Sequence, residues 1–427
     1  MSSTFATPEA TFRADATTIS VVGLAHATSH FFQLLLPPLF PWLGAEFSLS
    51  FAELGGLASL FYLVSAMGQA TSGFVVDRVG ARSVMFAALL LFALAAFVAS
   101  MATGYPMLVA AVVISGVANS PFHPVDYSII NQRVSAHRIG HAYSVHGVSG
   151  TLGYASATLV MVLLAETIGW RNALLVASAY GLCVLAVTVI FRNSIDTRFL
   201  AERIANAHAS ERNASRESSL AFMRQPVVWL CFAFFFVITF SNSAIQNFAT
   251  PALQAIVGLK LTVAATALTG YLVCSAIGQL VGGFAIARQW ADPEKIIAFG
   301  LVAAAALMLI AATGVLGAGG TLAVVMLAGL GAGVSGPPRD LLIKRATPAG
   351  ATGRVYGTVY SGLDAGLAVS APIFGWLMDH DVPRAMFIGS AMAMMVAMLI
   401  GLAVARSVHR NSITPLPISA SNTAARA

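Results

Sequence analysis

Histidines embedded in apolar sequence are the first residues of this chain that could do chemistry. The stretch "HATSHFFQ" places His26, His30 and Gln33 at positions i, i+4 and i+7, so their side chains share one face of a helix. Imidazoles there could bind an anion when protonated, relay protons, bond packed helices together, or ligate a metal. The sequence reveals no third ligand, so we expect neither a metal centre nor a cofactor.

A second polar stretch, "NSPFHPVDYSIINQ" (119–132), brings Asn119, His123 and Asp126 into another apolar segment. Its two prolines each remove a backbone donor and disrupt a helix. Broken helices are tolerated inside a membrane where they line a cavity or pack against protein. We therefore expect a bent helix that presents His123 and Asp126 to the inner part of a cleft.

The role of Asp126 has two interpretations that the sequence leaves open. Asp126, with His123, is a candidate for the group that takes up a coupling proton. Alternatively it forms a fixed ion pair with Arg82, Arg133 or Arg339 that gates the inner side. A charge at the centre of a membrane helix costs about 2.5–3.5 kcal/mol on insertion scales. Asp364, in a later span, raises the same choice between proton coupling and pairing.

Polar groups recur in the second half of the chain. Amide side chains lie in the middle of the span that begins near residue 227, and an arginine follows a Pro-Pro pair further on. We expect these groups to contact substrate, with the arginine as a clamp for an anion. They are Asn242, Gln246, Asn247 and Arg339.

The elements that position these residues are membrane helices. Of the 427 residues, 58% are hydrophobic and 9% are charged, whereas soluble domains carry about 25% charged residues. Continuous apolar runs, each near the ~20 residues that cross a bilayer as a helix, predict an all-α integral membrane protein. The twelve predicted spans are 19–43, 52–76, 83–103, 106–133, 140–165, 171–191, 227–256, 262–287, 296–316, 320–343, 353–377 and 384–406.

Basic residues orient these spans. If both tails and the even-numbered gaps are cytoplasmic, the other side holds only Arg171, Lys260 and Arg384 of the 23 lysines and arginines. This asymmetry predicts that both termini are cytoplasmic. The expected parts are a tail (1–18), a six-helix bundle (19–191), a cytoplasmic loop (192–226), a second six-helix bundle (227–406) and a final tail (407–427).

The two bundles repeat one pattern. "GQATSGFVVDR" (68–78) aligns with "GQLVGGFAIAR" (278–288), and "SHFFQLLLPP" (29–38) aligns with "NSAIQNFATP" (242–251). "GHAYSVHGVSGTLG" likewise matches "GRVYGTVYSGLDAG" at a similar offset. Pseudo-symmetric six-span halves that hold substrate between them near the midplane are the major-facilitator architecture.

The loop after the second span strengthens this interpretation. "GFVVDRVGAR" resembles the signature of the major facilitator superfamily in that loop, through Gly73, Asp77, Arg78, Gly80 and Arg82. Gly73 would permit close helix packing. Asp77 would face a helix N-terminus of the opposite half, and the arginines would meet acidic groups or lipid phosphates. We expect these contacts to latch the inner side shut.

The sequence carries no motif for ATP hydrolysis or for another catalytic site. No Gly-Lys pair occurs, so a phosphate-binding P-loop is excluded, and neither a hydrolase elbow nor a Cys-pair metal site is present. We expect a secondary transporter and not an enzyme. The rival class, a membrane enzyme or sensor, requires a catalytic cluster or an appended soluble domain. Expected partners are a small-molecule substrate, protons and the bilayer, with no nucleic acid and no obligate protein partner.

Two segments together resemble the fosmidomycin resistance family of the major facilitator superfamily: "GLAHATSHFFQLLLPPLFPWLGAEFSLSFAELG" and "SPFHPVDYS". The resemblance covers most of the first half, and the Phe-His-Pro piece is its most specific part. It carries over to His26, Gln33, Phe122, His123 and Pro124. It implies a proton-driven drug exporter of the bacterial inner membrane.

The sequence departs from that family at two positions. His30 stands where the family tends to have an acidic residue, and Asp126 stands near a position where glutamate is more usual. A histidine in place of a carboxylate favours an anion in the cleft. We therefore expect proton-coupled efflux (antiport) of a small polar or anionic compound by alternating access. The alternative is an importer that takes up a small carboxylate or phosphonate with protons.

Overall fold

The structure is a computed structural model that describes residues 8–197, 225–346 and 352–413, and the regular elements in these ranges are all helical. The helices are α1 (Pro8–Gln33), α2 (Phe40–Phe47), α3 (Phe51–Val79), α4 (Ala81–Ser100), α5 (Tyr105–Asn119), α6 (Phe122–Arg133), α7 (Ile139–Ile168), α8 (Trp170–Ile190), α10 (Pro226–Val257), α11 (Leu261–Ala287), α12 (Pro293–Thr313), α13 (Gly317–Val334), α14 (Gly336–Ala346), α15 (Thr352–Asp379) and α16 (Ala385–Ile413).

These helices build the twelve expected spans. Eleven segments of the described chain are long and apolar enough to cross a bilayer, and α15, with 28 residues, is the twelfth. Their ends agree closely with the predicted ones, except that α1 begins at Pro8 and α16 continues to Ile413. The predicted bend in the fourth span is confirmed, because α5 ends at Asn119 and α6 begins at Phe122.

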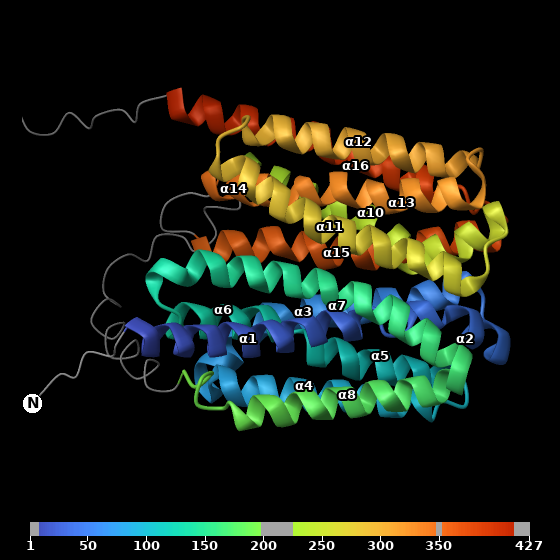
Figure 1. Ribbon diagram of the computed structural model, residues 1–427, viewed down its shortest axis with the longest axis horizontal. Helices are drawn as coiled ribbons and strands as arrows, with labels where there is room; N and C mark the ends of the chain where they lie inside the picture. Colours follow the sequence, from blue (N-terminus) through green and yellow to red (C-terminus); the bar gives the residue numbers. More distant parts are fainter. Residues whose placement is uncertain (1–7, 198–224, 347–351, 414–427) are drawn as a thin grey trace, which may run out of the picture.

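The internal repeat is visible as two bundles stacked in Figure 1, with α1–α8 below and α10–α16 above. Helix α1 packs against α7 as α10 packs against α15, and α4 packs against α8 as α12 packs against α16. The tenth span is broken between α13 and α14 as the fourth is broken between α5 and α6. These principal packing pairs therefore repeat between the halves.

The two halves meet mainly through α3 with α15 and α7 with α11. Glycines allow the first of these contacts to be close. A Cβ added at Gly55 would lie 2.5 Å from the carbonyl oxygen of Ala371, and one added at Gly375 would collide with the carbonyl of Phe51. Small residues at such positions let membrane helices approach backbone to backbone.

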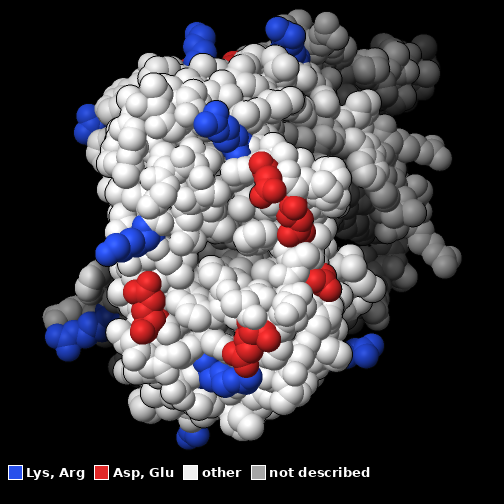
Figure 2. All heavy atoms as spheres, turned by 90° about the vertical axis from the view of Figure 1, so that its right-hand side faces the viewer, with Lys and Arg blue, Asp and Glu red and all other residues white. Residues whose placement is uncertain are grey.

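The end of the bundle far from the chain termini is closed. Asp379, at the end of α15, accepts hydrogen bonds from the backbone N–H groups of Phe51 (2.7 Å) and Ala52 (2.8 Å) at the start of α3. The ring of Phe248 lies beside those of Phe40 and Phe51, with centroids 6.1 and 6.3 Å apart. Figure 2 shows this face, where scattered acidic and basic groups stand on a mostly uncharged surface.

The opposite end is open. A cleft of about 800 Å³ enters beside the starts of α7 and α14, at the end where α1 begins and α16 ends. His141 and Arg339 line its mouth, and Tyr154, Asn242 and Tyr271 line its deeper part. The polar interior of the bundle is therefore accessible from the side of the chain termini and closed on the other side.

Candidate functional site

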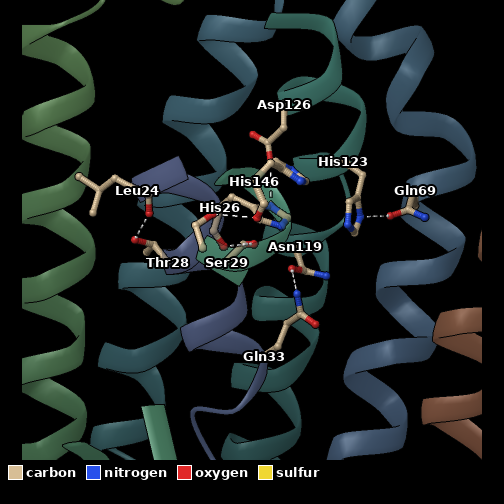
Figure 3. Close-up of polar contacts among 11 residues, drawn as sticks. Leu24, His26, Thr28, Ser29, Gln33, Gln69, Asn119, His123, Asp126 and His146 are labelled. Atoms are coloured by element: carbon tan, nitrogen blue, oxygen red, sulfur yellow. Dashed lines mark hydrogen bonds and ion pairs between the residues drawn. The ribbon is translucent and has the colours of Figure 1, made fainter. Parts of the chain in front are cut away.

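Four imidazoles and one carboxylate meet inside the first half, as Figure 3 shows in part. Asp126 Oδ2 accepts hydrogen bonds from His26 Nδ1 at 2.9 Å and from His146 Nε2 at 3.1 Å. The rings of His26 and His146 stack with centroids 3.5 Å apart, and His30 and His123 lie 4.5 and 5.6 Å from His26. Asp126, His26 and His146 are almost fully buried. We refer to these five residues as the histidine cluster.

The sequence assembles the cluster from three elements. The i, i+4 spacing on α1 aligns His26 with His30, and the break before α6 turns His123 and Asp126 toward them. Gly150 and Gly153 on α7 let that helix approach α1 closely. A Cβ at Gly153 would collide with the backbone of α1, and one at Gly150 would lie 2.9 Å from His26 Nε2.

Of the two interpretations of Asp126, the ion pair with an arginine does not hold for the described residues. Asp126 bonds to imidazoles because α6 faces α1 and α7, while the three candidate arginines lie at other helix ends. Arg82 pairs with the Asp196 carboxylate at 2.6 Å, Arg133 donates to the carbonyls of Asn193 and Ser194, and Arg339 pairs with the Asp340 carboxylate at 2.8 Å.

His123 and His30 differ in their partners. His123 Nδ1 lies 3.2 Å from Gln69 Oε1 on α3, so that nitrogen carries the proton and Nε2 keeps its lone pair. Both ring nitrogens of His30 are buried with no hydrogen-bond partner in the described structure, as is Asp126 Oδ1. Unpartnered buried polar atoms are rare, and each needs an explanation.

A chain of side-chain hydrogen bonds runs below the cluster. The Tyr154 hydroxyl donates to Gln33 Oε1 at 2.5 Å, Gln33 Nε2 donates to Asn119 Oδ1 at 3.1 Å, and Asn119 Nδ2 donates to Ser65 at 2.8 Å. Gln33 and Asn119, expected to contact substrate, are thus committed to partners within the first half. Tyr154 is the member of the chain that lines the cleft.

The second half supplies the opposite wall of the cleft. Asn242, Gln246 and Arg339 line it, as expected of substrate contacts, and the Tyr271 hydroxyl lies 3.4 Å from Asn242 Oδ1. Asn247 does not line it, because its Nδ2 donates to the Ser243 carbonyl within α10. The second wall therefore offers amides, hydroxyls and the Arg339–Asp340 pair.

Asp364 lies on α15 where the two halves face each other. One of its carboxylate oxygens, Oδ2, is buried and has no hydrogen-bond partner in the described structure. It lies close enough to the hydroxyls of Tyr62 on α3 and Tyr154 on α7 to act on them electrostatically. This carboxyl group therefore lies at the junction of the two halves.

The loop signature after the second span is only partly described. Gly80 ends α3 with a positive φ of 89°, which glycine adopts without strain. A Cβ at Gly73 would meet no described atom within 4 Å, since this side of the bundle is open, so its packing role in a closed state stays a prediction. Arg78 is exposed and Arg82 pairs within the first half, while the Asp77 side chain lies outside the described residues.

The comparison with known families decides the identity of the fold. The sequence profile of the Major Facilitator Superfamily matches residues 22–248 and 232–424. This chain belongs to the Major Facilitator Superfamily. The resemblance of its sequence motifs to that superfamily is thereby confirmed, and the chain is a multi-pass membrane protein.

Three relatives have names that indicate their cargo. The chain is 25% identical over 281 residues to the Fosmidomycin resistance protein of Escherichia coli K12, covering 62% of this chain and 64% of that protein. It is 23% identical to the Probable L-galactonate transporter of the same strain, covering 40% and 38%. It is 25% identical to the Niacin transporter of Acinetobacter baylyi, covering 43% and 42%. The matches span less than two thirds of each relative.

A solved structure shares the fold. The crystal structure of a bacterial homolog to the human lysosomal transporter Spinster, in an inward-facing and occupied conformation, superimposes with a TM-score of 0.73 at 12% identity. The match covers 96% of this chain and 100% of that one. Together with the profile match, this agreement confirms the predicted twelve-helix facilitator fold.

His146 is the member of the site that sequence reasoning missed. It lies on α7, where it is buried beside Asp126. A signal was available in the spacing of His146, Gly150 and Gly153 at i, i+4 and i+7, which marks one helix face. Small residues on that face indicate close packing against another helix.

Proposed function

We propose that this protein is a proton-coupled exporter (antiporter) of small anionic or polar compounds in the bacterial inner membrane. The observation that carries the proposal is the buried, unpartnered oxygen of Asp364 between the two halves. Ionisable groups inside membrane bundles are rare and mark ion and substrate pathways. With both termini cytoplasmic, as the basic loops predict, the open cleft faces the cytoplasm.

Asp364 is better suited to carry the coupling proton than Asp126. Asp126 Oδ2 already accepts bonds from two imidazoles, which fix that carboxylate within the first half. Asp364 faces residues of the other half, so its protonation changes the interaction between the bodies that move. Proton binding removes its charge and allows the junction to rearrange without an unpaired charge in the membrane.

The cleft supports an anionic or polar cargo. Its second wall presents the amides of Asn242 and Gln246, and Arg339 stands at its mouth. A phosphonate, a sugar acid and a pyridine carboxylate, the chemical classes suggested by the names of the three relatives, all carry an acidic group that such donors recognise.

Everted membrane vesicles with an acidic interior test this function. Fosmidomycin, galactonate and nicotinate are added one at a time while a fluorescent dye reports the proton gradient. An antiporter dissipates the gradient when its substrate is added outside, and a symporter does so only when the vesicles are preloaded. The variant Asp364→Asn should lose the response, whereas Asp340→Asn, in the Arg339 pair at the cleft mouth, should keep the coupling. A full response from Asp364→Asn would contradict the coupling role.

A further inference from the structure

Three histidines of the cluster form a set of nitrogen ligands that the transport cycle proposed above does not use. One ring nitrogen each of His26, His30 and His123 lies within 4.8 Å of those of the other two. They come from two turns of α1 and from the start of α6. Sequence spacing revealed only the first two, because the third reaches the site through the packing of α6 on α1.

The hydrogen bonds of the cluster leave one nitrogen of each ring available. His26 Nδ1 donates to Asp126 Oδ2 and His123 Nδ1 bonds to Gln69 Oε1, so Nε2 of both rings keeps a lone pair. Metal-bound histidines usually donate their other ring N–H to a carboxylate or another acceptor oxygen, which fixes tautomer and ring orientation. His30 has no partner at either nitrogen. The rings of His26 and His123 are thus oriented as metal ligands are, and that of His30 is not held by a hydrogen bond.

Gly150 lets the rings of His26 and His30 pack closely against α7. A Cβ added there would lie 2.9 Å from His26 Nε2 and 3.0 Å from His30 Nε2, so these two nitrogens lie beside the same point of α7. His30 and His123 are partly exposed. The His30 ring lies 4.3 Å, centroid to centroid, from that of Tyr154, which lines the cleft, so the trio adjoins the cleft wall.

We propose that His26, His30 and His123 bind a divalent transition-metal cation through their Nε2 atoms, leaving a fourth coordination position open. Three imidazoles and an open position suit Zn²⁺, and imidazole also suits Ni²⁺ and Cu²⁺, whereas Mg²⁺ and Ca²⁺ prefer oxygen ligands. Tetrahedral coordination at 2.0–2.1 Å would bring the nitrogens to about 3.3 Å from one another. His30 can make most of this movement, because no hydrogen bond holds its ring.

A second trio in the cluster, His26, Asp126 and His146, is less suited to a metal. Its ligand atoms already bond to one another at 2.9 and 3.1 Å, and its members are almost fully buried. A metal there would have to displace both shared protons. For the first trio, the hydrogen bond from His26 to Asp126 instead orients a ligand ring.

Equilibrium binding of Zn²⁺ to the purified full chain tests the site. The protein is isolated through a tag without histidine, and Zn²⁺ is titrated calorimetrically in the presence of excess Mg²⁺. We expect one Zn²⁺ per chain, and Co²⁺ in its place should give the strong visible absorption of a four-coordinate site. His30→Gln and His123→Gln should each weaken binding at least a hundredfold, and Asp126→Asn should weaken it 10–100-fold through the orientation of His26.

Matched variants separate metal binding from folding. His141→Gln removes an exposed histidine of the same cleft and should leave binding unchanged. Gly150→Ala puts a methyl group between the two Nε2 atoms and should block binding without removing a ligand, whereas a Cβ at Gly147 would meet only Gln279 Oε1 at 3.8 Å. Absence of stoichiometric binding to the wild type, or equal binding by His30→Gln, would overturn the site.

The role of the metal rests on the proposed transport function, but its binding does not. Proteoliposomes that enclose a zinc-sensitive dye distinguish two roles that both require the site. If Zn²⁺ enters the proteoliposomes and this entry is lost in His30→Gln, the metal is itself transported. If Zn²⁺ binds but does not enter, the bound cation instead supplies the positive charge that binds an anionic substrate. A gradient assay that fails while Zn²⁺ still binds would remove the proposed function and leave the metal site.

Discussion

Asp379 closes the end of the bundle far from the termini, and its removal should open that end. Its two carboxylate oxygens accept from the N–H groups of Phe51 and Ala52, so an acid of one half caps a helix of the other. An anion at an exposed helix N-terminus contributes typically 0.3–1 kcal/mol. Asp379→Asn also loses one of the two acceptor oxygens. We therefore take the change in the free energy of opening as about 1.4 kcal/mol, which raises the open population tenfold.

The population of the form with this end open can be measured by the chemical modification of a buried thiol. Ala371 is fully buried where α15 contacts Gly55 of α3, so Ala371→Cys reacts only after the contact opens. The background replaces the natural cysteines, and the protein is held in detergent so that a maleimide reaches both ends. When closing is fast compared with modification, the rate follows the equilibrium population of the open form.

Glu53→Gln is the matched control for the loss of charge. Glu53 lies at the same helix end as the Asp379 contact, but its carboxylate bonds to Ser50 in its own half. We expect about tenfold faster modification for Asp379→Asn and the parent rate for Glu53→Gln. Equal modification rates in the parent and Asp379→Asn would refute the role of Asp379 in closure. Faster rates in both variants would show that any loss of negative charge at this helix end opens the contact.

Further predictions concern stability and packing. Asp126→Asn should lower the stability by about 1–3 kcal/mol, because a neutral amide replaces the charged acceptor that two buried imidazole donors share, and Asp364→Asn should not; thermal unfolding in detergent compares them. Gly333→Ala should reduce the yield of folded protein in size-exclusion chromatography, because its Cβ would collide with the backbone of α11. Gly283→Ala should be tolerated, since its Cβ would meet one atom at 3.9 Å. Gly73→Ala should weaken the vesicle response, because the predicted packing in a closed state leaves little room for a methyl group, and an unchanged response would contradict that packing.

The spans and their breaks could be read from the sequence because hydropathy and proline act locally. The apolar runs mark the helices, and the missing N–H of Pro121 accounts for the gap between α5 and α6. The repeat then indicated the pairing of helices within each half. These features depend on short windows of sequence and on the comparison of two such windows.

The partners of the buried groups could not be read in the same way. Whether Asp126 meets an arginine or an imidazole depends on how α6 and α7 are rotated about their axes. That rotation follows from close contacts such as Gly153 against α1, which join residues far apart in sequence. Gln33 and Asn119 show the same limit, because their mutual bond withdraws both from the cleft.

The histidine cluster belongs wholly to α1, α6 and α7, and this has a consequence for the proposed metal. If one half rocks against the other, as the proposed function requires, the bonds of Asp126 to its imidazoles move together within one half. The described part of the second half that lines the cleft carries amides, hydroxyls and the Arg339–Asp340 pair. A cation bound by His26, His30 and His123 would therefore keep all its protein ligands in either orientation, and its affinity would depend on the first half alone.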